Sequence, residues 1–125
     1  MSDQNKILVI DDDDIFLYTA SFAINQANPN VSIITSNNGE DALTKAESFN
    51  PKAIFVDLNM PIMSGWEFLD ELAKKDKWYS VPIVIVTSSI DWDDKQRAKN
   101  HPLKPSFVEK PLSADKIRQL DIPNF

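Results

Sequence analysis

The chain has 125 residues, of which 42% are hydrophobic and 26% are charged, values typical of one globular domain rather than of a disordered or fibrous protein. It contains no cysteine, which excludes disulfide bonds, thiolate metal sites and cysteine nucleophiles. The net charge of −6 would repel a phosphate backbone, so we expect no nucleic-acid partner. The first residues hold a single lysine and a short apolar run, so we expect neither a signal peptide nor membrane insertion, and a cytoplasmic location.

Five short apolar segments, rich in β-branched residues, have the length and composition of strands. They are residues 7–10, 31–34, 53–56, 83–86 and, more weakly, 107–108. Three of them are apolar throughout, which is typical of parallel strands that are covered on both faces.

Segments with helical spacing separate the strands. Three apolar stripes, which we expect to face the core, consist of Ile15, Tyr18, Phe22, Ile24 and Ala27; Ala42, Leu43, Ala46 and Phe49; and Trp66, Leu69, Leu72 and Ala73. A polar helix over 91–99, an irregular link over 101–105 and a short helix over 113–120 follow. This strict alternation predicts a single α/β domain over 1–125: a doubly wound, five-stranded parallel sheet with helices on both faces.

Helix boundaries carry capping residues. We expect Asp13 or Asp14 to cap the first helix, Ser64 the third and Ser113 the last. The sequence has fourteen aspartates and only five glutamates, so capping accounts for part of an unusual excess of aspartate. The remaining aspartates need another explanation.

Polar side chains stand directly after four of the predicted strands: Asp11 and Asp12, Asp57, Thr87, and Lys110. The carboxyl ends of parallel strands share one edge of the sheet, where ligands bind. Three carboxylates in one place need cations, and an oxygen-only set of ligands favours Mg²⁺ beside the lysine. A carboxylate with a metal, an amine and a hydroxyl suits acyl-phosphate chemistry, in which the aspartate attacks phosphorus.

Four motifs in this order and spacing resemble the receiver domain of two-component response regulators, over nearly the whole chain. They are Ile7–Asp13 (ILVIDDD), Val56–Pro61 (VDLNMP) with Met63-Ser64-Gly65, Ile85–Ser88 (IVTS) and Val108–Pro111 (VEKP). The resemblance implies a flavodoxin-like fold with strand order 2-1-3-4-5.

The resemblance also implies roles for the residues at the strand ends. Asp57 would accept the phosphoryl group. Asp12, Asp57 and the main-chain carbonyl of Asn59 would bind Mg²⁺ directly, with Asp11 acting through water. Lys110 would pair with the phosphoryl group, and the Lys110–Pro111 bond matches one that is usually cis in the family.

A switch is implied as well. The Thr87 hydroxyl would bond a phosphoryl oxygen, and Phe107, at the family's aromatic switch position, would swing inward as Thr87 moves. Because Phe107 lacks the hydroxyl of the tyrosine often found there, such a switch would work by packing alone. Asn59 and Ser89 stand where the family tunes loss of the phosphoryl group to water.

We therefore expect a stand-alone receiver without an output domain. It would take its phosphoryl group from a histidine kinase or a histidine phosphotransfer protein, and it would signal through the face of the fourth helix, fifth strand and fifth helix. It would not be a turnover enzyme, apart from slow self-dephosphorylation. Two alternatives stay open: a receiver-like scaffold that no longer switches, and a phosphohydrolase acting through Asp57.

The remaining aromatic residues and the histidine receive structural interpretations. Trp66, Trp78 and Tyr79 are expected to pack around the third helix, whereas Trp92 is open between packing and partner contact. His101, the only histidine, is expected on the surface of the link, away from the strand ends.

Overall fold

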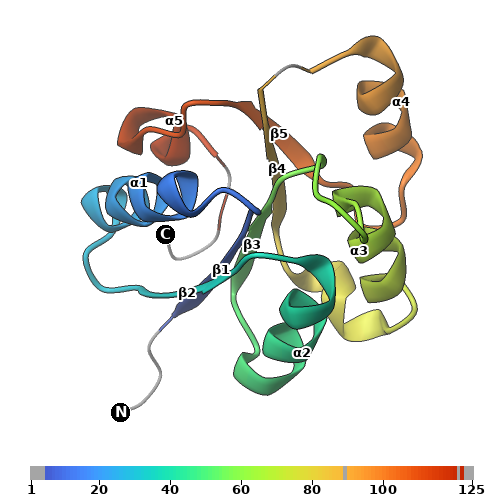
Figure 1. The fold of residues 1–125 in the computed structure, drawn as a ribbon, viewed down its shortest axis with the longest axis horizontal. Helices are drawn as coiled ribbons and strands as arrows, with labels where there is room; N and C mark the ends of the chain where they lie inside the picture. Colours follow the sequence, from blue (N-terminus) through green and yellow to red (C-terminus); the bar gives the residue numbers. More distant parts are fainter. Residues whose placement is uncertain (1–4, 89, 121, 123–125) are drawn as a thin grey trace.

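Five parallel strands form one sheet in the order β2-β1-β3-β4-β5 in this computed structural model (Figure 1). The structure describes residues 5–88, 90–120 and 122. The strands are β1 (Lys6–Ile10), β2 (Ser32–Ser36), β3 (Ala53–Val56), β4 (Ile83–Thr87) and β5 (Ser106–Glu109). The predicted α/β fold and strand order are confirmed.

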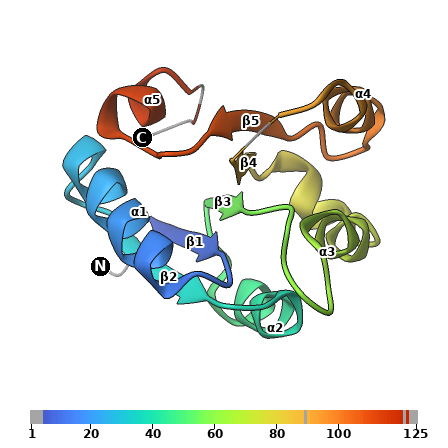
Figure 2. The same ribbon diagram turned by 45° about the horizontal axis from the view of Figure 1, so that its top comes forward.

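Helices cover both faces of this sheet (Figures 1 and 2). One face is covered by α1 (Asp14–Ala27) and α5 (Ala114–Arg118). The other face is covered by α2 (Gly39–Phe49), α3 (Gly65–Leu72) and α4 (Trp92–Asn100). A short 3₁₀ helix, η1 (Asp76–Ser80), precedes β4 and was not predicted. None of the helices in the described ranges combines the length and the apolar character needed to cross a membrane.

The sheet has a hydrophobic core on each face because successive side chains of a strand point to opposite sides. In β1, Ile7 and Val9 pack with α1 and α5, while Leu8 and Ile10 pack with α2 and α3. Strands β1, β3 and β4 are buried almost throughout, as their continuous apolar sequences predict.

Side-chain caps fix where the helices begin. Each of the five α-helices has an N-cap side chain that accepts a backbone N–H bond from the first turn, and these residues are Asp13, Asn38, Ser64, Asp91 and Ser113. Ser64 and Glu67 form a complete capping box. The caps predicted at 13 or 14, 64 and 113 are confirmed.

The predicted core face of α1 is wrong in part: Ile24 and Ala27 pack in the core as predicted, but the other three residues do not. Ile15, Tyr18 and Phe22 are exposed, whereas Leu17 and Ala20 are buried together with Ala23 and Ile24. Both stripes have helical spacing, and the one with small alanines lies against the sheet and α5, because small side chains let a helix approach closely. Periodicity alone could not decide between them.

One further expectation fails near α3. Trp66 and Trp78 are buried as predicted, and Tyr79, although half exposed, lies at the end of α3, where its hydroxyl donates to the Ala73 carbonyl. His101 is not a surface residue: only 6% of it is exposed, because its ring packs beside Trp66 and bonds Asp70.

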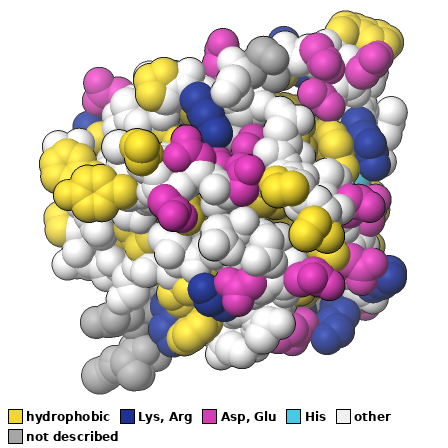
Figure 3. Space-filling model, in the orientation of Figure 1, with side chains coloured by type: hydrophobic (Ala, Val, Ile, Leu, Met, Phe, Trp, Pro, Cys, Tyr) yellow, Lys and Arg dark blue, Asp and Glu magenta, His cyan; other side chains and the backbone are white. Residues whose placement is uncertain are grey.

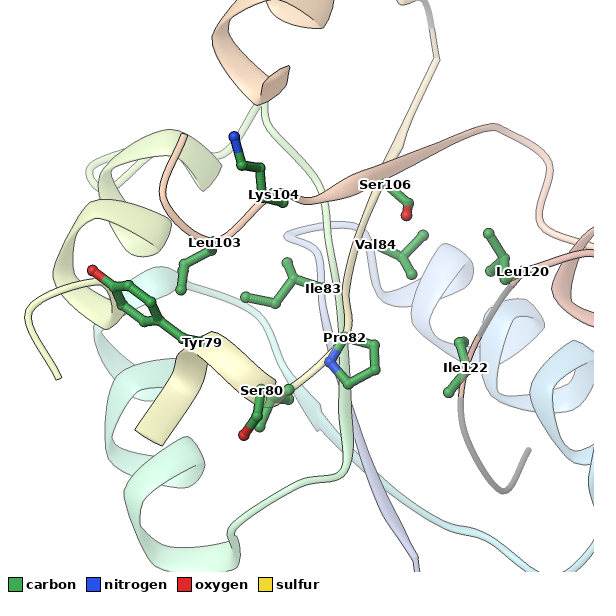
Figure 4. Close-up of a pocket in the computed structure, with 11 residues that line it drawn as sticks. Tyr79, Ser80, Pro82, Ile83, Val84, Leu103, Lys104, Ser106, Leu120 and Ile122 are labelled. Atoms are coloured by element: carbon green, nitrogen blue, oxygen red, sulfur yellow. The ribbon is translucent and has the colours of Figure 1, made fainter. Parts of the chain in front are cut away.

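A groove of about 340 Å³ lies at the amino ends of β4 and β5 (Figure 4). Its lining includes Ile83, Ser106, Leu103 and Tyr79. The groove is therefore at the sheet edge opposite the predicted phosphorylation site.

Gly65 should be hard to replace. A Cβ at this position would lie 2.4 Å from the Asp57 carbonyl oxygen and 2.8 Å from the Leu58 Cα, both main-chain atoms that cannot move without displacing the loop. We expect Gly65→Ala to lower the free energy of unfolding by about 1 to 3 kcal/mol in urea titrations. Gly39→Ala is the matched control, because its Cβ would meet only the flexible Met63 side chain. An equal or larger loss for Gly39→Ala would contradict this explanation.

Candidate functional site

Three strands deliver the candidate site to one edge of the sheet. Asp11 follows Ile10 in β1, Asp57 follows Val56 in β3, and Lys110 follows Glu109 in β5. The register pairs Ile10 with Val56, so the two aspartates leave neighbouring strands at the same height. Their backbones are held in the same way, because the Asp57 N–H donates to the Ile10 carbonyl and the Asp11 N–H to the Ser36 carbonyl, each at 3.0 Å.

Acidic side chains gather at this edge (Figure 3). One carboxylate oxygen from each of Asp11, Asp12 and Asp57 lies within 4.8 Å of the other two. Asp11 and Asp57 are buried, whereas Asp12 is exposed. The structure therefore brings together the three carboxylates that the sequence placed at the strand ends.

Lys110 joins the carboxylates from β5. Its Nζ lies 2.8 Å from Asp11 Oδ2 and 3.6 Å from Asp57 Oδ2. The same ammonium lies 4.3 Å from the centroid of the Phe16 ring, a cation–π contact that sequence reasoning missed. Phe16 follows the acidic motif in α1, but nothing in its spacing indicates that its ring would face a lysine that is distant in the sequence.

Burial and like charge disfavour ionisation of the buried carboxyls. Desolvation raises the pKa of Asp11 above 3.8, opposed by its bonds to Lys110 and to the Asp13 N–H. Desolvation and the charge of Asp11 raise the pKa of Asp57, opposed by Lys110 and the Asn59 N–H. Burial alone would lower the pKa of Lys110, but the bond and charge of Asp11 raise it. One lysine does not compensate for three carboxylates, so a further cation would stabilise the ionised site.

The other predicted site residues lie near this cluster in the chain. Thr87 is buried at the end of β4, and its carbonyl accepts the Lys110 N–H at 2.8 Å. Asn59 is exposed in the loop after β3. Phe107 is half-buried in β5 and packs against the core on the α2–α4 side. The Lys110–Pro111 bond is cis, as predicted, and Ser89 lies outside the described residues.

The donor set fits magnesium. Hard oxygen ligands from carboxylates, together with a nearby main-chain carbonyl, are those Mg²⁺ takes in proteins. Burial, the main cause of the raised pKa values of Asp11 and Asp57, disfavours their ionised forms, which a bound cation would stabilise. Asp11, Asp12 and Asp57 are therefore the candidate ligands that the geometry supports, and the Asn59 carbonyl is a candidate that the family resemblance implies.

Known proteins resemble this chain along nearly all of its length. The family described as "Response regulator receiver domain" matches residues 7–120. Protein PilG of Pseudomonas aeruginosa is 30% identical over 129 residues, which cover 99% of this chain and 92% of PilG. A protein-glutamate methylesterase/protein-glutamine glutaminase of Halalkalibacterium halodurans is also 30% identical, over 96% of this chain but only 36% of that protein.

A solved structure agrees in fold. The crystal structure of a two-component response regulator from Cytophaga hutchinsonii superposes with a TM-score of 0.83 and 27% identity, covering 92% of each chain. The chain belongs to the response-regulator receiver domain family. Receiver domains accept phosphoryl groups from histidine kinases and generally use Mg²⁺.

The destabilisation that the buried, like-charged carboxylates cause can be measured by removing one charge. Because the pKa of Asp57 is higher in the folded than in the unfolded chain, the folded state binds more protons in mildly acidic solution. Stability from this group is therefore gained as the pH falls through the folded pKa and is lost at neutral pH. We expect Asp57→Asn, without divalent cations, to raise the free energy of unfolding at neutral pH by about 1 kcal/mol and the melting temperature by about 4 °C.

Thermal melts at neutral and mildly acidic pH check this expectation. The stabilisation should shrink as the pH falls, because wild-type Asp57 is then protonated. Asp115→Asn is the control, since the Asp115 side chain is 87% exposed. A variant at Asp57 that is less stable than wild type at neutral pH would contradict the argument.

Proposed function

We propose that this chain is a stand-alone receiver that takes a phosphoryl group onto Asp57 from a phosphohistidine of a separate histidine kinase or histidine phosphotransfer protein. The supporting observation is the cluster itself: a buried aspartate with two further carboxylates and one lysine at the carboxyl edge of the sheet. Phosphoryl transfer needs mainly positioning and charge compensation, which such a cluster provides.

In the proposed transfer, an oxygen of the Asp57 carboxylate forms a bond to phosphorus as the P–N bond of the donor breaks. The electron pair of that bond stays on the imidazole nitrogen. Lys110 lies 3.6 Å from Asp57 Oδ2 and would turn its ammonium toward the phosphoryl oxygens. Magnesium, held by Asp12, Asp57 and the Asn59 carbonyl, with Asp11 through water, would supply positive charge against those same oxygens.

The phosphorylated chain would signal through contacts and not through turnover. Thr87 and Phe107 would report the phosphoryl group to the face of α4, β5 and α5, shifting an existing equilibrium between two conformations. Water would slowly remove the phosphoryl group from Asp57. This face carries the exposed Trp92 on α4 and the short helix α5.

Exposed apolar side chains on α1, which begins just after the acidic motif, and in the loop after Asp57 support a protein donor. Ile15, Tyr18 and Phe22 lie at intervals of three and four residues along α1, and large apolar side chains are visible over this helix (Figure 3). Ile62, in the loop after Asp57, is 92% exposed and has a φ of 71°, an unusual conformation for a β-branched residue. A donor that brings its phosphohistidine to Asp57 must cover this part of the surface, where apolar contacts would hold it.

The central experiment is phosphorylation by a small acyl or amino phosphate with Mg²⁺, followed by intact mass measurement. We expect wild type and Asp115→Asn to gain one phosphoryl group, Asp57→Asn to gain none, and chelation of the metal to stop the reaction. Lys110→Met should slow it by about 10- to 100-fold, because a charge that stabilises the transition state is lost. Uptake by Asp57→Asn, or none by wild type, would refute the proposal.

The donor surface can be separated from the chemistry with a pair of exposed tyrosines. Tyr18 lies in the second turn of α1, the helix that begins just after the acidic motif, whereas Tyr79 lies on η1 at the amino ends of the strands. We expect Tyr18→Ser to lower kcat/KM for transfer from the protein donor by about 10-fold, because a large apolar contact is lost. Donors would be found by profiling the histidine kinases and transfer proteins of the source organism.

Two comparisons make that test specific. Tyr79→Ser should transfer like wild type, and both variants should react normally with the small phosphate donor. Equal losses in the two variants, or a loss with the small donor, would show that Tyr18 does not act through donor docking.

A further inference from the structure

Helix α4 has a weak hydrophobic attachment to the sheet. Of its nine residues, Trp92–Asn100, only Ala98 is buried, and most of the others are polar or charged. An alanine buries little apolar surface. Other contacts must therefore hold α4 in its place against α3.

Those contacts come from matching stripes of the two helices. Trp66 and Asp70 are four residues apart on α3, and Asp94, Arg97 and His101 follow the same spacing, three and four residues apart, along α4 and its C-cap. We call these five residues the α3–α4 clamp.

Besides the ring contact of Trp66 with His101, four contacts join the two sides of the clamp. The Trp66 indole N–H donates to Asp94 Oδ1 at 3.2 Å, and the Arg97 guanidinium lies 4.8 Å from the Trp66 ring centroid. Arg97 also pairs with Asp70 Oδ2 at 3.7 Å. His101 Nε2 lies 2.9 Å from Asp70 Oδ1.

His101 connects the clamp to the link before β5. Its Nδ1 accepts the Leu103 N–H at 3.2 Å, so the ring proton is on Nε2 and is donated to Asp70. The backbone N–H of His101 donates to the Ala98 carbonyl at the C-terminal end of α4, and the backbone carbonyl of His101 accepts the Lys104 N–H. Because Leu103 packs in the same core as Phe107, the clamp also fixes the segment that leads into β5.

The clamp joins the elements that follow Asp57 and Thr87. Helix α3 begins next to Asp57, where the Gly65 N–H donates to the Leu58 carbonyl at 3.0 Å. Helix α4 begins a few residues after Thr87, at its cap Asp91. A displacement of α4 relative to α3 would therefore need these contacts to break.

We propose that the α3–α4 clamp is a conformational latch: it holds α4 against α3 and opposes a displacement of α4 that phosphorylation of Asp57 drives. That the clamp holds α4 is a statement about the unphosphorylated chain alone. That phosphorylation of Asp57 displaces α4 rests on the proposed function. The clamp residues act as positioning residues, since none of them contacts the acidic cluster in the interactions described. Weakening the latch lowers the free-energy difference between the two placements of α4 and so favours the phosphorylated form.

The latch is tested first by amide hydrogen exchange of the unphosphorylated chain. Asp70→Ala removes the partner of His101 and Arg97, and Trp66→Phe keeps a ring but removes the bond to Asp94. In both variants we expect amides of α4 to exchange about 3- to 10-fold faster, with β1 and β3 unchanged, because one or two hydrogen bonds are lost from a locally opening unit. Glu71→Ala is the control, because Glu71 is next to Asp70 but its carboxylate pairs with the exposed Lys74 and not with α4.

Unchanged α4 exchange in both variants would overturn the latch. So would acceleration throughout the chain, because α4 would then not open separately. His101→Gln provides a rescue measurement, since its amide N–H can replace the Nε2 donor to Asp70. Its α4 exchange should lie nearer to wild type than that of Asp70→Ala, and an equal acceleration would count against the His101–Asp70 bond.

The link to phosphorylation is tested with beryllofluoride and Mg²⁺, followed by NMR titration. We expect Asp70→Ala and Trp66→Phe to bind this phosphoryl analogue about 3- to 10-fold more tightly than wild type, and Glu71→Ala to bind equally well. Equal or weaker binding by both clamp variants would overturn the proposed opposition. If wild type itself binds no beryllofluoride, the proposed function fails, while the exchange measurement still decides whether the clamp holds α4.

Discussion

The site depends on one electrostatic constraint: a parallel sheet places three carboxylates at one edge, and one lysine partly compensates for them. Asp11 and Asp57 lose hydration because they follow strands that are buried on both faces. The Lys110 ammonium lies closer to Asp11 than to Asp57, so it compensates the negative charge of Asp57 less completely. The fold thus holds the acidic groups in a state that a metal ion or a bound phosphoryl group with its metal can relieve.

The rest of the molecule holds the three carboxylates close together despite their mutual repulsion. The Asp57 backbone is fixed by the Ile10 carbonyl and by the close approach of Gly65, so repulsion between the carboxylates cannot simply push the loop outward. Two apolar cores, one on each face, hold the strands that deliver the charges. The sheet and its two cores therefore stabilise the fold, whereas the carboxylates gathered at the carboxyl ends of the strands, which serve the function, destabilise it.

The sequence predicted well those features that depend on local chemistry or on the geometry of parallel strands. Continuous β-branched runs identified the buried strands, and alternation with helices identified the doubly wound sheet. Asp11, Asp57 and Lys110 could be placed together because each directly follows a strand. The strand order came from family resemblance, since alternation alone does not fix it.

Features that depend on packing between distant segments were not predictable in the same way. On α1 two stripes had helical spacing, and only contact with the sheet and α5 selected the stripe of Leu17 and Ala20. His101 appeared to be a loop residue because its partners, Asp70 and the Trp66 ring, lie more than a full helix away in the sequence. The Phe16 contact to Lys110 joins segments from opposite ends of the chain.

The positions of α1 and α4 relative to the site suggest how one small domain can serve two partners. Each helix follows a strand whose carboxyl end borders the acidic cluster, but α1 covers one face of the sheet and α4 the other (Figure 2). The exposed apolar side chains Ile15 and Tyr18 belong to α1, whereas the clamp joins α3 and α4. A donor held on α1 would reach Asp57 without covering α4. Because α1 and α4 lie on opposite faces of the sheet, the donor could load the site while α4 stays free to respond.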